Sequence, residues 1–253
     1  MERMPPVTGS SAGPAGQAAA NDYDSFAEAY SAANEVSLHN AYYERPATLA
    51  LAGDVAGRRV LDAGCGSGPL SAALRDRGAI VSGFDKSTGM LEVARRRLGP
   101  DADLRVADLA GPLPYPDGAF DDVIASLVLH YLEDWTAPLA ELRRVLRPGG
   151  RLIASVDHPM AGHPLLRPGA DYFATFQYPT ETITFSGQNF TLLLWHRPLP
   201  AMTSAFTAAG FRIAAIDEPL PAPDTPRELL PESLREGRQA GFLCFLFFVL
   251  EAD

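Results

Sequence analysis

The chain is 253 residues long and carries a net charge of −10, from 21 basic and 31 acidic residues. This length suits one α/β domain with a large buried core. The acidic balance opposes nucleic-acid binding, which depends on clustered Lys and Arg side chains that neutralise phosphates. Its two cysteines provide neither a disulfide framework nor a thiolate metal site, and no compact Asp, Asn and His cluster indicates another metal. We therefore expect a small-molecule partner, no nucleic acid and no metal.

Residues 1–20 consist mainly of Pro, Gly, Ser, Thr and Ala, so we expect a disordered leader there. They lack the charged-then-apolar pattern of a secretion signal. The apolar run Phe242–Leu250 is too short to cross a membrane and suits an interior strand. These features predict a cytoplasmic protein without a membrane partner, in which residues 21–253 form a single domain.

The first part of that domain, residues 21–56, is predicted to be helical. Tyr23, Phe26, Ala27 and Tyr30 recur at i, i+3, i+4 and i+7 behind a polar capping pair. An aromatic stripe with this spacing usually packs into a core.

A second helix is expected over about residues 40–51. It carries Tyr42, Tyr43 and Arg45, which are candidates to line a substrate site. Packing between helices is the alternative interpretation of the same three residues.

A glycine-rich turn follows the apolar strand that begins near Val60. Asp62 ends this strand, and Gly64, Gly66 and Gly68 come next on alternate positions. Glycines allow a sharp turn and the close approach of a ligand to the backbone. A helix can begin at Pro69, and the N-terminus of a helix attracts anionic groups. This segment predicts a cofactor-binding loop.

Two further strands also end in an acid. Asp85 follows the apolar segment 79–84, and Asp108 follows the short strand 104–106. The distance of 85 − 62 = 23 positions is close to the roughly 20 residues that separate a glycine turn from a ribose-binding acid in open α/β sheets. Three acids at the carboxyl ends of successive strands predict a ligand site at that edge of the sheet.

The order of elements from residue 58 to 153 alternates strands with helices, apart from a proline-rich loop at 109–118. Such alternation predicts a doubly wound, mostly parallel sheet with helices on both faces. Glu133–Val145 has helical spacing and is expected to be scaffold. Segments 211–216 and 242–250 would complete a seven-stranded, Rossmann-like sheet.

The pattern changes at about residues 158–200, which hold three histidines, several prolines and short β-branched or aromatic runs. We expect an inserted cap of short strands. Such an insertion would stand over the carboxyl edge of the sheet, close a pocket and exclude water. Substrate identity is therefore expected to depend on this segment.

Together these motifs resemble the class I S-adenosylmethionine-dependent methyltransferases. VLDAGCGSG at 60–68 is similar to their first motif, FDDVIASL at 120–127 to their fourth strand, and LRPGGRL at 146–152 to the turn before their fifth strand. The resemblance covers about residues 22–157. Beyond it, His158-Pro159, His196-Arg197 and 217–219 are similar to the branch related to quinone-biosynthesis and secondary-metabolite methyltransferases.

The resemblance implies S-adenosylmethionine as cofactor, S-adenosylhomocysteine as product and a helical lid at 21–56. It implies that Asp85 holds the ribose hydroxyls, that 107–109 frames the adenine, and that aromatic residues of the first helix cover the cofactor. The implied cofactor-binding residues are Tyr23, Tyr30, Asp62, Gly64, Cys65, Gly66, Asp85, Lys86, Met90, Ala107, Asp108, Leu109 and Ser126.

Two alternatives to a methyltransferase stay open. A degenerate nicotinamide-dinucleotide motif can be laid over the turn, although Pro69 breaks one frame and Asp62 would repel a pyrophosphate. An oxidoreductase is therefore the weaker interpretation. A catalytically silent cofactor-binding protein is the other, and the retained acids and glycines count against it.

The expected reaction is transfer of a methyl group to an oxygen or nitrogen of a small metabolite. A sulfonium methyl is already activated, so the enzyme chiefly aligns it with the nucleophile and removes a proton where one is present. Histidine is the natural base at neutral pH. His130 and His158 follow the fourth and fifth strands and are the candidate catalytic residues. The candidate substrate-binding residues are Tyr42, Tyr43, Arg45, Tyr131, His163 and His196.

Overall fold

The computed structural model describes residues 21–161, 169, 171–180, 183–185 and 188–253, so the expected leader lies outside the described residues. A seven-stranded sheet has the order β10-β11-β5-β4-β1-β2-β3. Its strands are β1 (Arg59–Ala63), β2 (Ile80–Asp85), β3 (Asp103–Val106), β4 (Phe120–Ser126), β5 (Leu146–Asp157), β10 (Phe211–Asp217) and β11 (Phe245–Ala252). Strands β1 to β5 pair in parallel, whereas β11 is antiparallel to both β5 and β10. The predicted seven-stranded, mostly parallel sheet is confirmed.

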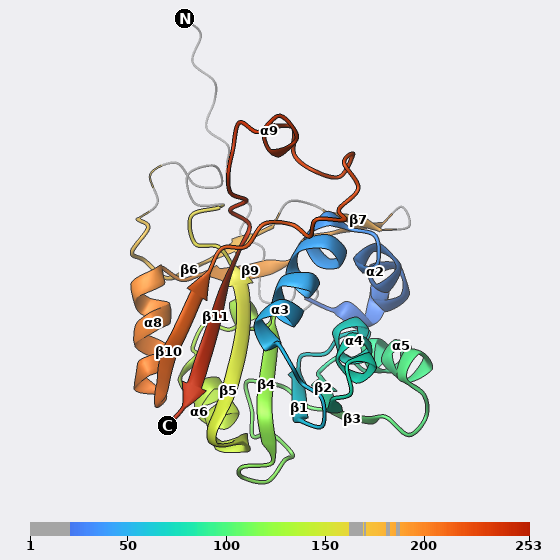
Figure 1. Ribbon diagram of the computed structural model, residues 1–253, viewed down its shortest axis with the longest axis vertical. Helices are drawn as coiled ribbons and strands as arrows, with labels where there is room; N and C mark the ends of the chain where they lie inside the picture. The colour runs from blue at the N-terminus through green and yellow to red at the C-terminus, as the bar shows by residue number, and fades with distance from the viewer. Residues whose placement is uncertain (1–20, 162–168, 170, 181–182, 186–187) are drawn as a thin grey trace, which may run out of the picture.

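Helices flank this sheet (Figure 1). The α-helices are α2 (Ala27–Asn34), α3 (Arg45–Ala52), α4 (Pro69–Asp76), α5 (Thr88–Leu98), α6 (Thr136–Val145), α8 (Leu199–Ala208) and α9 (Glu232–Arg235). Two 3-10 turns, η1 (Tyr23–Phe26) and η3 (Leu129–Tyr131), and a π-helical segment, η2 (Leu38–Glu44), complete the set. The helix expected at Glu133 begins at Thr136, because the Asp134 carboxylate accepts hydrogen bonds from the backbone and hydroxyl of Thr136 in a preceding turn. None of these helices combines the length and apolar character needed to cross a membrane.

Alternating strand residues fill two cores, one on each face of the sheet. Leu61 and Val123 belong to the core that receives α6 and α8. Their neighbours Val60 and Ile124 belong to the core that receives α3 and α4. Successive side chains of a strand point to opposite faces, so strands buried on both faces read as continuous apolar runs. This burial fixes the sheet, and with it the edge where the acids stand.

The segment predicted to be a cap contains two small sheets within its described residues. Strands β6 (Phe176–Pro179) and β9 (Leu193–His196) form one, and β7 (Ile183–Phe185) and β8 (Gln188–Phe190) form the other. Figure 1 shows β6, β7 and β9 at the same end of the molecule as α2 and the carboxyl ends of β4 and β5. The Asn21 side chain joins these parts, since it accepts from the backbone of Leu193 and donates back to the same residue, at 2.9 and 3.0 Å.

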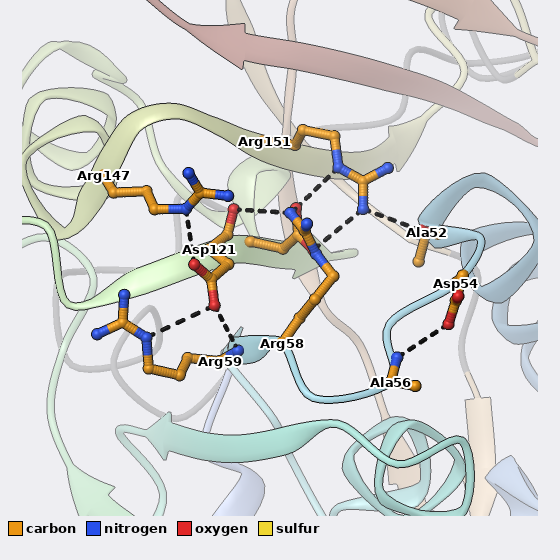
Figure 2. Close-up of polar contacts among 9 residues, drawn as sticks. Ala52, Asp54, Ala56, Arg58, Arg59, Asp121, Arg147 and Arg151 are labelled. Carbon is orange, nitrogen blue, oxygen red and sulfur yellow. Dashed lines mark hydrogen bonds and ion pairs between the residues drawn. The ribbon is translucent and has the colours of Figure 1, made fainter.

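Acidic and basic side chains meet at the opposite end of the central strands (Figure 2). Asp122 of β4 is 1% exposed and binds the guanidinium groups of Arg58 and Arg151 through both carboxylate oxygens. Arg151 also donates to the carbonyl of Ala52 at the end of α3, at 3.0 Å. This cluster stabilises the start of the central strands and lies apart from the acids at their carboxyl ends.

Candidate functional site

The predicted glycine turn leaves β1 and leads into α4 at Pro69. Gly64, Gly66 and Gly68 all have positive φ, at 75°, 53° and 78°. The backbone N–H groups of Gly64 and Cys65 both donate to the carbonyl of Phe84, at 2.9 Å, which ties the turn to β2. Positive φ is a conformation that residues with a side chain rarely adopt. Glycine therefore forms this turn without the backbone strain that a side chain would add.

Replacing Gly64 by Ala is expected to cost more stability than the same change at Gly66. A Cβ on Gly64 would stand 2.7 Å from a methyl group of Val128, whereas one on Gly66 meets nothing within 4 Å. We expect a loss of about 2–4 kcal/mol for Gly64→Ala and about 1 kcal/mol for Gly66→Ala, where only the backbone strain remains. Urea unfolding of both variants measures the difference, and equal losses would contradict this account.

Asp85 organises the turn from the end of β2. Its carboxylate accepts the backbone N–H groups of Gly66 and Ser87, each at 2.9 Å. Burial raises the pKa of Asp85, and these two hydrogen bonds oppose that effect. A carboxylate has about four lone-pair sites, so two stay available for a ligand.

Asp62, at the end of β1, is the deepest acid of the site. It is 1% exposed and accepts the Ser71 hydroxyl at 2.6 Å. Burial raises the pKa of Asp62 to about 7, helped by the nearby charges of Glu44 and Asp85, while the Ser71 hydrogen bond opposes the rise. The Asp62 carboxyl group therefore gains or loses its proton near neutral pH.

The raised pKa of Asp62 predicts a pH-dependent stability. An acid whose folded pKa lies above its unfolded value stabilises the fold below the unfolded pKa, and that contribution is lost as pH rises toward 7. Relative to Asp62→Asn, the ligand-free chain is expected to lose roughly 2–4 kcal/mol between pH 5 and pH 8. Urea unfolding at both pH values tests this. A stability difference that does not change with pH would contradict it.

Three tyrosines form a wall of the site. Tyr23 and Tyr30 come from η1 and α2, and their rings meet edge to face with centroids 5.1 Å apart. Tyr131, from η3, hydrogen-bonds through its hydroxyl to the hydroxyl of Tyr23. Burial raises the pKa of all three phenols. They therefore stay protonated at neutral pH and serve as hydrogen-bonding and aromatic surface rather than as bases.

One cavity brings these groups together at the carboxyl ends of β1, β2 and β4 and beside β3. All thirteen residues that the resemblance implied for cofactor binding line it, and so do Arg45 and Tyr131 from the predicted substrate set. Further lining residues that sequence reasoning missed are Asn21, Asn34, Asn40, Glu44, Ser67, Pro69, Leu70, Phe84, Leu127, Val128 and Leu132. The acids that follow three separate strands thus face a single space.

Neither predicted catalytic histidine lines this cavity. The His130 ring is buried, and its Nδ1 accepts the backbone N–H of Asp157 at 3.2 Å. Burial lowers the pKa of His130, although Asp157 opposes the shift. His158 is also buried, with Nε2 2.8 Å from the Glu218 carboxylate and Nδ1 accepting the N–H of Met160. Neither histidine ring is therefore part of this cavity wall, and a catalytic role for either one stays a prediction.

Three of the predicted substrate residues also lie away from the cavity wall. Tyr43 is fully buried against Phe245, with ring centroids 5.5 Å apart, so packing accounts for it. Tyr42 uses its backbone carbonyl to accept the N–H of Ala222. The His196 ring stacks on Phe176 and donates to the carbonyl of Tyr172 at 2.8 Å. His163 lies outside the described residues.

The sequence contains little that could have predicted the additional cavity-lining residues. Glu44 stands between Tyr43 and Arg45, two residues already singled out, yet its partners come from β4 and β5 far along the chain. Leu127 has a φ of 49°, the one positive value at a non-glycine residue among those described. Non-glycine residues in this conformation concentrate at functional sites, but a leucine in the sequence does not predict a left-handed conformation.

The parallel sheet, the glycine turn and the acids at successive strand ends define a Rossmann-like enzyme that binds its ligand at the carboxyl edge of the sheet. Comparison with known proteins identifies the family to which this enzyme belongs. The methyltransferase domain family matches residues 61–154. A demethylmenaquinone methyltransferase of Clavibacter sepedonicus is 39% identical over 193 residues, which cover 69% of this chain and 78% of that protein. The chain belongs to the S-adenosylmethionine-dependent methyltransferases.

Two further similarities agree with that assignment. A malonyl-[acyl-carrier protein] O-methyltransferase of Serratia marcescens is 40% identical over 139 residues, 55% of this chain and 52% of that protein. The crystal structure of an S-adenosylmethionine-dependent methyltransferase from Mesorhizobium loti superposes with a TM-score of 0.61 and 28% identity, covering 81% of this chain and 96% of that one. The span matched by the family model, 61–154, includes Asp62 and the three glycines of the turn.

Proposed function

We propose that the cavity binds S-adenosylmethionine and presents its methyl group to an oxygen or nitrogen of a small metabolite. The observation that carries this proposal is the convergence of Asp62, Asp85 and Asp108 on one cavity beside the glycine turn. Asp85 would hold the ribose hydroxyls with its remaining lone pairs. Asp108 and the buried Leu109 would frame the adenine from the end of β3. Carboxylates and exposed backbone groups suit a cofactor with a diol, an amine and a positive charge.

When bound, S-adenosylmethionine supplies a methyl group that is already activated by its sulfonium. The chain then has to align the acceptor and keep water away. We propose that residues 21–56 act as a lid and that β6 to β9 act as a cap. Asp24 of η1 supports this, because its carboxylate accepts the hydroxyl of Ser87 at 2.6 Å and the N–H of Gly89 at 2.7 Å. The lid is thereby fastened to the start of α5.

Alignment, more than proton transfer, is the proposed contribution of the chain to catalysis. The tyrosines of the wall stay protonated, and the neutral ring of His130 carries its proton on Nε2 because Nδ1 accepts a backbone N–H. A histidine base therefore stays a prediction for His130 and His158, and it would require the acceptor to reach beyond the cavity wall. The Asp157 carboxylate lies 3.7 Å from Nδ1 of His130 and accepts the Tyr178 hydroxyl at 2.9 Å.

The acceptor class can be found by transferring a labelled methyl group. The named relatives suggest two classes to include, a demethylated menaquinone ring and a malonyl thioester carboxyl, beside simple phenols and amines. Protein with S-adenosylmethionine carrying a carbon-13 methyl is incubated with each acceptor, and the chemical shift of the product methyl identifies the atom that received it. Transfer to oxygen or nitrogen supports the proposal. Transfer to carbon, or binding of the cofactor without transfer to any acceptor, would contradict it.

A further inference from the structure

Glu44 is an acid of the cavity wall that the methyltransferase motifs do not include. Its side chain is 96% buried, since only 4% of the residue is exposed. One oxygen, Oε1, accepts the hydroxyls of Thr48, Ser126 and Ser155, each at 2.7 Å. An oxygen that accepts three donors carries no proton of its own. The side chain is therefore held firmly from one side.

The direction of the hydrogen bond between Ser155 and Glu44 is fixed by the backbone. The N–H of Leu127 donates to the Ser155 hydroxyl at 3.0 Å, so the hydroxyl proton of Ser155 is left for Glu44. The same contact holds Leu127 in its left-handed conformation beside the cavity. Among the described residues, no donor reaches the second oxygen of Glu44, Oε2. Glu44 lines the cavity, so its second oxygen is open to a donor on a ligand bound there.

The charges around the cavity favour a cationic donor. Four acidic side chains line it, Glu44, Asp62, Asp85 and Asp108, against two basic ones, Arg45 and Lys86. The Arg45 guanidinium is already engaged by the Asn34 side chain at 2.6 Å and by a carboxylate of the lid at 3.3 Å. The wall thus keeps an excess of negative charge, which a ligand with a positive group would balance.

The order of the strands indicates which part of the ligand reaches Glu44. Asp108 and Asp85 follow β3 and β2 at one side of the cavity, and the partners of Glu44 end β4 and belong to β5 at the other. In the proposed function the adenosine lies over β2 and β3, so the amino-acid end of the cofactor extends toward β4. We propose that Oε2 of Glu44 accepts a hydrogen bond from the α-ammonium group of that end. This inference rests on the proposed function.

Asp62 is the competing site for the same ammonium group. It ends β1, between the two sides of the cavity, and one of its oxygens is already bound by the Ser71 hydroxyl. If Asp62 alone held the ammonium, a substitution at Glu44 would have the same effect on the affinity of a ligand with the amine and of one without it. A ligand that lacks only this amine therefore separates the two possibilities.

The experiment titrates S-adenosylhomocysteine and its deaminated analogue into the unaltered chain and into Glu44→Gln by calorimetry. Glutamine keeps a carbonyl oxygen for the three hydroxyls but places a donor where the proposal requires an acceptor. We expect S-adenosylhomocysteine to bind Glu44→Gln about 10–100-fold more weakly, as for a lost charged hydrogen bond, and the deaminated analogue to change less than threefold. Glu232→Gln, the same change at a side chain of α9 that is 67% exposed, is the matched control and should alter neither.

The outcomes separate this inference from the function on which it rests. If S-adenosylhomocysteine fails to bind the unaltered chain, the proposed function itself fails. If it binds, but Glu44→Gln weakens both ligands equally or neither, the inference alone is overturned. Should Glu44→Gln not fold, Glu44→Asp replaces it in the experiment. Aspartate keeps the negative charge but is shorter by one methylene, so its carboxylate no longer reaches the ammonium. We then expect the same loss of affinity for S-adenosylhomocysteine and no such loss for the deaminated analogue. Thermal unfolding of each variant shows which case applies.

Discussion

Replacing Asp85 by Ala is expected to lower the affinity for S-adenosylhomocysteine at least 100-fold, or by about 2.7 kcal/mol. Two effects add. The ligand loses a carboxylate acceptor, and the N–H groups of Gly66 and Ser87 lose the partner that holds the turn in place. Charged hydrogen bonds contribute roughly 1.5–3 kcal/mol each. Calorimetric titration of the variant measures the loss.

Asp103→Ala is the matched control for this change. Asp103 starts β3, its side chain is 44% exposed, and it binds Ser82 and Arg105 away from the cavity. It should leave the affinity unchanged. Near-equal affinities for Asp85→Ala and the unaltered chain would show that the ligand does not meet β2, and the proposed orientation of the cofactor would be wrong.

Replacing Asp122 by Ala is expected to cost about 3–5 kcal/mol of folding free energy, because it leaves two guanidinium groups without their shared partner. Burial would raise the pKa of Asp122, but hydrogen bonds from Arg58 and Arg151 outweigh it and hold the pKa below its ordinary value. A lowered pKa stabilises the fold above the unfolded value, and the contribution is lost as pH falls. The difference in the free energy of unfolding between the unaltered chain and Asp122→Ala should therefore become smaller below about pH 4.

The neighbouring Asp121 supplies the control on the same strand. Its carboxylate meets Arg59 and Arg147, whose side chains are 49% and 44% exposed (Figure 2). Asp121→Ala is expected to cost about 1 kcal/mol, as for solvent-exposed pairs. Urea unfolding of both variants tests this, and similar losses would show that burial of the cluster does not matter. Folded Asp122→Ala should still bind S-adenosylhomocysteine normally, because the cluster lies at the opposite end of β4.

Local chemistry explains why the convergence of the glycine turn and the three acids on one cavity was predictable. Positive φ at Gly64 and Gly66 demands glycine, and the carboxyl ends of parallel strands must share one edge, so Asp62, Asp85 and Asp108 point to the same place. Both facts are visible in a short stretch of sequence. The central strands β1, β4 and β5 were predictable because most of their residues are buried on both faces.

The acceptor side depended on contacts between distant segments. Tyr43 was equally suited to a pocket or a core until β11, about 200 residues later, supplied Phe245 as its packing partner. His130 follows β4, but the left-handed turn at Leu127 redirects the chain and leaves Tyr131 facing the cavity instead. Glu44 acquires its role only when β4 and β5 bring their serines to it. No local pattern encodes these three placements.

Titration of the purified chain with S-adenosylhomocysteine, beside NADH and NADPH, tests the central claim most directly. The claim is that the acids and the glycine turn form a methyltransferase cofactor site. It predicts micromolar binding of S-adenosylhomocysteine and no binding of either dinucleotide. Binding of a dinucleotide without S-adenosylhomocysteine would contradict it.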